Sequence, residues 1–103
     1  MGLKSEMTVD SLPPWGVAEP AKAEPLYRRV LALKEKLLGP DHVEVALTLS
    51  NLAALCHAQG RTTEAAALYQ RALAIGEPAL GPHHPGVLAW REDDAVLRQG
   101  NPA

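Results

Sequence analysis

One stretch of sequence occurs twice and decides the fold: AEPLYRRVLALKEKLLGPDHVEVA at residues 23–46 and AAALYQRALAIGEPALGPHHPGVL at residues 65–88. The copies are offset by 42 residues and are identical at 12 of 24 positions. A period of about 40 residues is typical of repeat proteins, whose units stack because none can bury its apolar face alone. The sequence therefore predicts a stack of similar supersecondary units.

Each unit is predicted to be a pair of helices. Asp41-His42-Val43-Glu44 has the pattern of a capping box, in which Asp41 accepts a hydrogen bond from a backbone N–H of the first turn. Gln59-Gly60 ends that helix, since glycine adopts positive φ readily, and Thr62 is the expected N-cap of the next. We expect four helices, over about residues 20–38, 42–58, 62–80 and 86–98.

Composition agrees with an all-α fold. The 103 residues include 17 Ala and 16 Leu, which favour helices, but only 12 Val, Ile and Thr together. The length allows one domain. A net charge of −2 argues against a nucleic-acid or anionic-membrane surface, and a single Cys excludes an internal disulfide and a Cys-based zinc site. No signal peptide or membrane-spanning run is found, so we expect a cytoplasmic protein.

The apolar residues of the second helix make two stripes, which predicts a central helix between two neighbours. The first stripe contains Val45, Leu49, Leu52, Ala53 and Cys56, and the second contains Leu47, Ala54, Leu55 and Ala58.

The ends of the chain deviate from the repeat. Residues 1–18 have no helical period and are predicted to be a disordered arm, followed by a repeat domain over 19–98 and a tail over 99–103. Gly76 and Pro78 predict a kink or an early helix end near residues 75–79. Glu92-Asp93-Asp94 stands where the central helix has Ser50-Asn51-Leu52 and is expected to be a solvated cap.

The stretch from Thr48 to Leu73, with small residues at Ala53, Ala65 and Ala72 and large ones at Leu49, Leu52 and Tyr69, resembles a tetratricopeptide repeat. The linker Leu38-Gly39-Pro40-Asp41-His42 resembles that of the 42-residue variety in kinesin light chains and nephrocystin-3-like proteins. The resemblance implies a short right-handed solenoid that binds a protein or peptide on its concave face. The positions concerned are Leu47, Ser50, Asn51, Ala54, His57 and Ala58. Asn51 matches an asparagine that holds the ligand backbone in relatives.

No residue pattern indicates catalysis, a cofactor or a metal site. His42, His83 and His84 lie in the two connectors, and neither Cys nor paired carboxylates complete a ligand set with them. Cys56 lies on an apolar stripe and is therefore expected to be an inert buried thiol, although His57 follows it in the sequence. The basic residues of the first helix, which are Arg28, Arg29, Lys34 and Lys36, are expected to form a solvated face.

Two alternatives to peptide binding stay open. The first helix has no preceding partner for one side of its apolar face, so the chain could form homo-oligomers through Tyr27, Val30 and Leu31. The other alternative is a truncated repeat fragment without a separate function. The charged residue Asp94 in the last helix and Pro78 in the third favour this alternative.

Overall fold

The computed structural model describes residues 20–99 and contains four helices in that range, with no strand. The helices are α1 (Pro20–Leu38), α2 (Val43–Ala58), α3 (Thr62–Leu80) and α4 (Pro85–Gln99). The predicted all-α fold is confirmed. The expected arm over 1–18, and the tail beyond Gln99, lie outside the described residues. No helix in the described range is long and apolar enough to cross a membrane.

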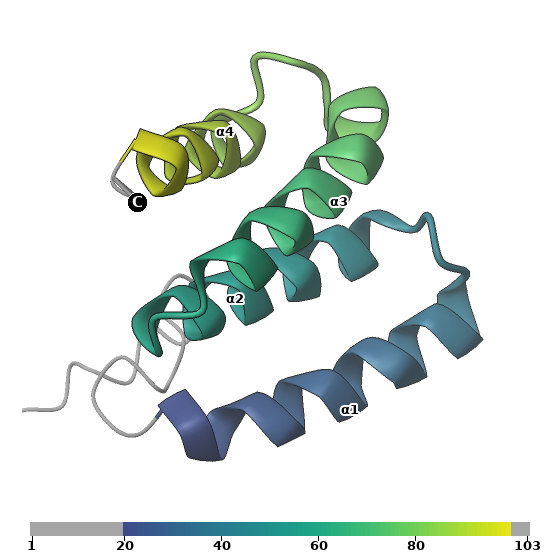
Figure 1. The fold of residues 1–103 in the computed structure, drawn as a ribbon. Helices are drawn as coiled ribbons and strands as arrows, with labels where there is room; N and C mark the ends of the chain where they lie inside the picture. Colours follow the sequence, from purple (N-terminus) through teal and green to yellow (C-terminus); the bar gives the residue numbers. More distant parts are fainter. Residues whose placement is uncertain (1–19, 100–103) are drawn as a thin grey trace, which may run out of the picture.

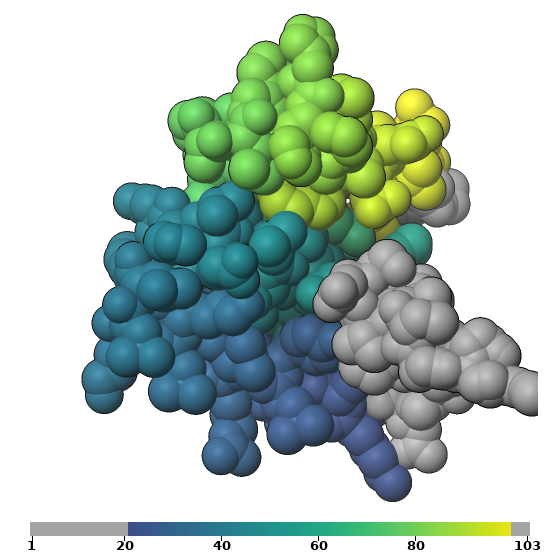
Figure 2. All heavy atoms as spheres, turned by 180° about the vertical axis from the view of Figure 1, so that it is seen from behind, coloured from purple at the N-terminus to yellow at the C-terminus, as the bar shows by residue number. Residues whose placement is uncertain are grey.

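The helices stack in chain order, each packed against the next (Figure 1). α2 lies between α1 and α3, as its apolar stripes predict, and α4 packs on α3. The space-filling view from behind shows the same order as tiers, from α1 to α3 and α4 (Figure 2). The central position explains why α2 has the largest share of buried residues among the four helices, whereas α1 has none that is fully buried.

Small residues at the helix crossings let the backbones approach closely. Ala53, Ala65 and Ala72 are completely buried, as the repeat pattern predicts. They belong to a core cluster that unites α2, α3 and α4, with Leu31 of α1 packed at its edge. All residues of the first predicted α2 stripe are buried, whereas the second stripe is buried only at Leu55 and in part at Ala54.

The N-terminal caps differ from those predicted. The N-cap of α2 is His42 instead of Asp41, and its Nδ1 accepts a hydrogen bond of 3.0 Å from the backbone N–H of Glu44. His84 makes the same 3.0 Å bond with the N–H of Gly86 at the start of α4. The imidazole ring thus accepts the capping hydrogen bond that an Asp or Ser side chain usually accepts. At α3 the N-cap is Arg61 instead of Thr62, and no side chain caps this helix.

α3 does not end early. It continues through Gly76 and Pro78 to Leu80, and Gly81 follows with φ of 98°. Pro78 lacks the N–H that would bond the carbonyl of Ala74, but Ala74 is exposed, so water can take that place. Gly76 is buried against Trp90 of α4, which explains why glycine stands at this point in the helix. The expected early helix end is therefore wrong.

Candidate functional site

The six residues predicted to bind a ligand lie along α2 and are named here the α2 face. Their exposure differs. Leu47, His57 and Ala58 are exposed, and Asn51 and Ala54 are half-buried. Ser50 is buried, and its Oγ donates a hydrogen bond of 2.8 Å to the carbonyl of Leu47 in the same helix. The hydroxyl of Ser50 is thus occupied within α2.

Asn51 is in the centre of the α2 face. Its side chain is half-buried, and its amide makes no hydrogen bond with another residue in the range 20–99. An amide group has two donors and an acceptor with two lone pairs, so Asn51 retains its full capacity to bond a backbone or a side chain.

α4 carries an acidic residue at the position that is equivalent to Asn51 of the α2 face. Asp93 follows Asn51 at the repeat offset of 42 and is exposed, and Tyr69 of α3 donates a long hydrogen bond of 3.5 Å to its Oδ2. Partial burial of the carboxyl raises the pKa of Asp93, and the Tyr69 hydroxyl and a charge on His57 oppose this rise. The sequence reasoning missed Asp93 as a site residue, although its repeat equivalence to Asn51 was a usable signal.

The neighbouring residue, Asp94, is not part of a solvated cap. Its side chain is 8% exposed, and its Oδ2 accepts hydrogen bonds from Gln70 at 2.6 Å and from Arg98 at 3.0 Å. Its Oδ1 is buried and has no partner within the described range. Asp94 therefore occupies the interior position that Leu52 has in α2, and the expectation of solvent exposure is wrong for it.

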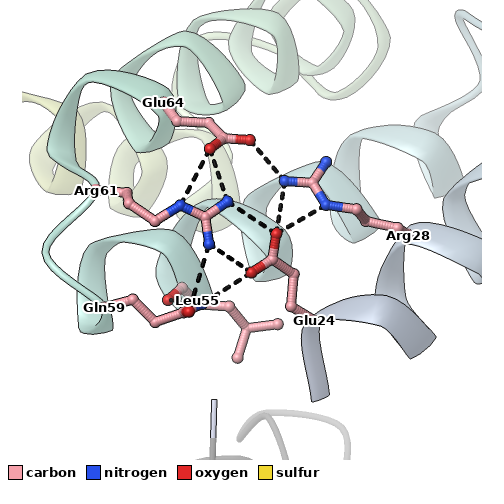
Figure 3. Close-up of polar contacts among 6 residues, drawn as sticks. All are labelled: Glu24, Arg28, Leu55, Gln59, Arg61 and Glu64. Atoms are coloured by element: carbon pink, nitrogen blue, oxygen red, sulfur yellow. Dashed lines mark hydrogen bonds and ion pairs between the residues drawn. The ribbon is translucent and has the colours of Figure 1, made fainter. Parts of the chain in front are cut away.

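The densest polar cluster joins α1 to the start of α3 (Figure 3). Arg61 donates to Glu24 through Nη1 at 2.6 Å and Nη2 at 2.9 Å, and to Glu64 at 2.7 Å. Arg28 bridges the same two carboxylates, and Gln59 adds a bond of 2.9 Å to Glu24. The pKa of Glu24 is lowered to about 2, mainly by the hydrogen bond from Arg61. Burial of the carboxylate is the next largest effect, and it opposes this by raising the pKa.

Glu24, Cys56 and Glu64 have the spacing of a metal site but not its chemistry. Their ligand atoms lie within 4.8 Å of one another. However, both carboxylates are bonded to guanidinium groups, so the centre of the cluster is already occupied by positive charge. Burial raises the pKa of the Cys56 thiol, which disfavours the thiolate that a metal needs. The cluster instead joins α1 to the start of α3 through ion pairs.

The basic residues of α1 are divided between two environments. Arg28 is exposed, as expected, although it pairs with Glu24 and Glu64. Lys34 is half-buried and pairs with Glu44 at 3.0 Å, so the expected solvation is incomplete there. Arg29 and Lys36 are exposed. Of the predicted self-association residues, Tyr27 and Leu31 are half-buried, whereas Val30 is exposed.

The paired antiparallel helices, with alanines at their crossings and a period of 42 residues, agree with the comparison to known families. The family model for the tetratricopeptide repeat matches residues 18–77 and, overlapping, 44–100. The chain belongs to the tetratricopeptide repeat family. Comparison with curated proteins gives no match. Tetratricopeptide repeats generally mediate protein–protein interactions, and the family is typically not enzymatic.

Proposed function

We propose that this tetratricopeptide repeat protein binds a peptide segment or a helix of a partner protein on the α2 face, the concave face of a solenoid of this family. The observation that carries the proposal is the half-buried amide of Asn51, which has no hydrogen-bond partner in residues 20–99. Leaving such a group unpaired in a closed interior is costly, whereas an accessible amide can bond an incoming backbone.

The surroundings of Asn51 suit a mixed contact. Leu47 and Ala58 offer exposed apolar surface above and below it on the same helix. Asp93 of α4 and His57 of α2 supply charge and hydrogen-bonding groups at one end. Interfaces of this kind combine an apolar centre with polar groups that fix orientation. The negative charge of Asp93 favours a segment with a basic residue at that end.

Peptide selection followed by mutation tests this proposal. A displayed library of random peptides is selected on the full chain, and the affinity of the best binder is measured by calorimetry for wild type, Asn51→Ala and Thr63→Ala. Thr63 is exposed on another helix, α3, and serves as the matched control. We expect Asn51→Ala to weaken binding about tenfold, the value of one good hydrogen bond, and Thr63→Ala to leave it unchanged. Equal affinities for all three proteins would refute the role of Asn51.

Self-association through Tyr27, Val30 and Leu31 is a second candidate, favoured by the exposure of Val30 and its neighbour Leu26. Light scattering of the purified chain over a range of concentrations tests it, since a constant monomer mass contradicts it. The kinesin-light-chain-like subtype is supported by the 42-residue period and stays a prediction. The cytoplasmic location and the alternative of a fragment without separate function also stay predictions.

A further inference from the structure

The outer side of α1 carries an apolar row that no other part of residues 20–99 covers. Four large residues recur at i, i+4, i+7 and i+11, the spacing by which one helix packs against another in a coiled coil. We name them the α1 seam: Leu26, Val30, Leu33 and Leu37, which are 60%, 39%, 57% and 75% exposed. A hollow of about 390 Å³ opens at its start, lined by Ala23, Leu26, Tyr27 and Val30. Surfaces of this kind usually mark contact sites.

The repeat indicates which kind of structural element can pack against the α1 seam. At the offset of 42 residues, Leu26, Val30 and Leu33 correspond to Leu68, Ala72 and Ile75 of α3. These α3 residues are not exposed: Ala72 and Ile75 are buried in the core cluster, and Leu68 packs against it. The helices α2 and α4, which pack against α3, cover these residues. The same positions on α1 therefore have the shape and chemistry of a helix-packing surface.

The charges of α1 are segregated around the seam. In the heptad pattern that contains it, one flank consists of basic residues only, namely Lys22, Arg29 and Lys36. The acidic residues of α1 point the other way, toward the body of the protein. Glu24 is bound by Arg28 and Arg61, and Glu35 is bound by Arg71 at 2.5 Å. Within residues 20–99, Arg29 and Lys36 form no ion pair. The outer surface of α1 is thus apolar with a positive margin.

Arg29 has a repeat equivalent that shows the partner it suits. The equivalent residue in α3 is Arg71, and Arg71 reaches across to Glu35 on α1. An arginine at this position of the repeat thus reaches a carboxylate on the helix one repeat earlier. Arg29 lacks such a carboxylate among the described residues.

We propose that the α1 seam binds an amphipathic helix of a partner protein that carries acidic side chains beside its apolar stripe. The leucine and valine side chains provide the apolar contact, and Arg29 and Lys36 select for carboxylates on the incoming helix. This site lies on α1 and is separate from the α2 face, so the two can be tested independently.

A second copy of this chain fits the seam less well. Two antiparallel α1 helices would bring their basic margins together, which costs affinity. In the parallel orientation the margin of one copy would face Tyr27 and Lys34 of the other, which offer no carboxylate. α4 of another copy is not suited either, because the positions equivalent to Leu49 and Cys56 of α2 are Arg91 and Arg98. Both arginines are ion-paired within their own copy, and they put charged side chains where α2 has apolar ones.

Two synthetic helical peptides test the proposal on the full chain. Both are about three heptads long with Leu and Val in the apolar stripe, but one carries Glu and the other Lys at the flanking positions. Fluorescence anisotropy gives their affinities for wild type, Leu33→Asp, the double variant Arg29→Glu/Lys36→Glu, and Asn51→Ala. Because Leu33, Arg29 and Lys36 are exposed, these substitutions leave the core intact. Circular dichroism and melting of each variant check this.

We expect the acidic peptide to bind wild type at least about tenfold more tightly than the basic peptide, with a preference that weakens in high salt. Leu33→Asp abolishes binding of the acidic peptide, the double charge reversal inverts the preference, and Asn51→Ala changes nothing. Equal affinity for both peptides, or no binding of either, overturns the proposal. So does a preference that survives the charge reversal, or a loss of binding in Asn51→Ala. A wild-type dimer in light scattering that Leu33→Asp converts to monomer also overturns it, in favour of a second copy.

Discussion

The indole ring of Trp90 lies so close to Gly76 that a Cβ added to residue 76 would be 2.6 Å from Cζ3 of the ring. Both residues are buried, and they join α3 to α4 at the end of the stack. The repeat equivalent of Gly76 in α1 is Lys34, so the glycine is specific to this copy. It provides the room that Trp90 needs, which outweighs the low helix propensity of glycine at that position.

Gly76→Ala is expected to destabilise the protein. Helix propensity alone would stabilise it by about 1 kcal/mol. Overpacking against a rigid buried ring costs about 1–3 kcal/mol, so the net change in the free energy of unfolding is a loss of up to about 2 kcal/mol. Urea denaturation followed by circular dichroism measures it.

Two further variants separate packing from propensity at this position. Ala74→Gly, at an exposed position of the same helix, calibrates the propensity effect. In a Trp90→Leu background the clash is absent, and Gly76→Ala should then stabilise. If Gly76→Ala stabilised the wild-type protein as well, the close contact with Trp90 would not limit this position.

Glu24→Gln is expected to lower the free energy of unfolding by about 2 kcal/mol, the order of a charge-assisted hydrogen bond that is largely removed from solvent. The side chain of Glu24 is 12% exposed and is bonded by Arg28 of α1 and by Arg61, the N-cap residue of α3, so its charge is difficult to replace. The pair of Lys34 and Glu44, whose side chains are 30% and 45% exposed, provides the control, because Glu44→Gln should cost much less. Similar losses in both variants would show that the bonds of Glu24 contribute no more to the free energy of unfolding than the pair of Lys34 and Glu44.

The same carboxylate predicts a pH dependence. Its pKa falls from 4.5 to about 2 on folding, mainly through the bond from Arg61. The stabilisation is therefore complete above pH 4.5 and is lost as the pH falls toward 2. Glu64, whose pKa is lowered by Arg61 and Arg28, acts in the same direction, and Asp93, whose pKa is raised by burial, acts in the opposite one. The difference in stability between wild type and Glu24→Gln should be constant above about pH 5 and shrink below it. A difference that stays constant down to pH 2 would contradict the lowered pKa.

Local sequence patterns predicted those features that depend on one helix and its spacing. The buried stripe through Val45 and Leu49 and the small residues at Ala53 and Ala72 follow from the repeat. The contacts of Gly76 and Asp94 depend on how a second helix lies across the first, and spacing within one helix does not contain that information. The cap at His42 was missed because Asp41, the more usual N-cap, precedes it. The position of Asn51 on α2 follows from the helix pattern alone.

Asp94 offers a last test, since it is a charged residue at an interior position of the repeat. Its Oδ2 is bonded by Gln70 and Arg98, but its Oδ1 is buried without a partner in the described range. Gln70 and Arg98 are exposed, so both can return to water when the carboxylate is removed. Replacing both members of a buried ion pair by apolar residues is often neutral or stabilising by about 1–4 kcal/mol. Here only the carboxylate is buried, since the side chain of Arg98 is 59% exposed, so no buried charge is left unpaired. Asp94→Leu, which restores the residue type of Leu52, is therefore expected to raise the free energy of unfolding by about 1 kcal/mol.

Two variants of α4 make this result interpretable. Asp94→Asn keeps the shape but weakens the bond with Arg98, so it should be less stable than wild type. Ala95→Leu adds a leucine at the adjacent exposed position and shows what the larger side chain does without burial. Thermal and urea unfolding of the three proteins give the order expected when desolvation of the carboxylate outweighs its two hydrogen bonds: Asp94→Leu above wild type, and Asp94→Asn below it. If Asp94→Leu proved the least stable of them, the carboxylate would be a net stabilising contact between α3 and α4.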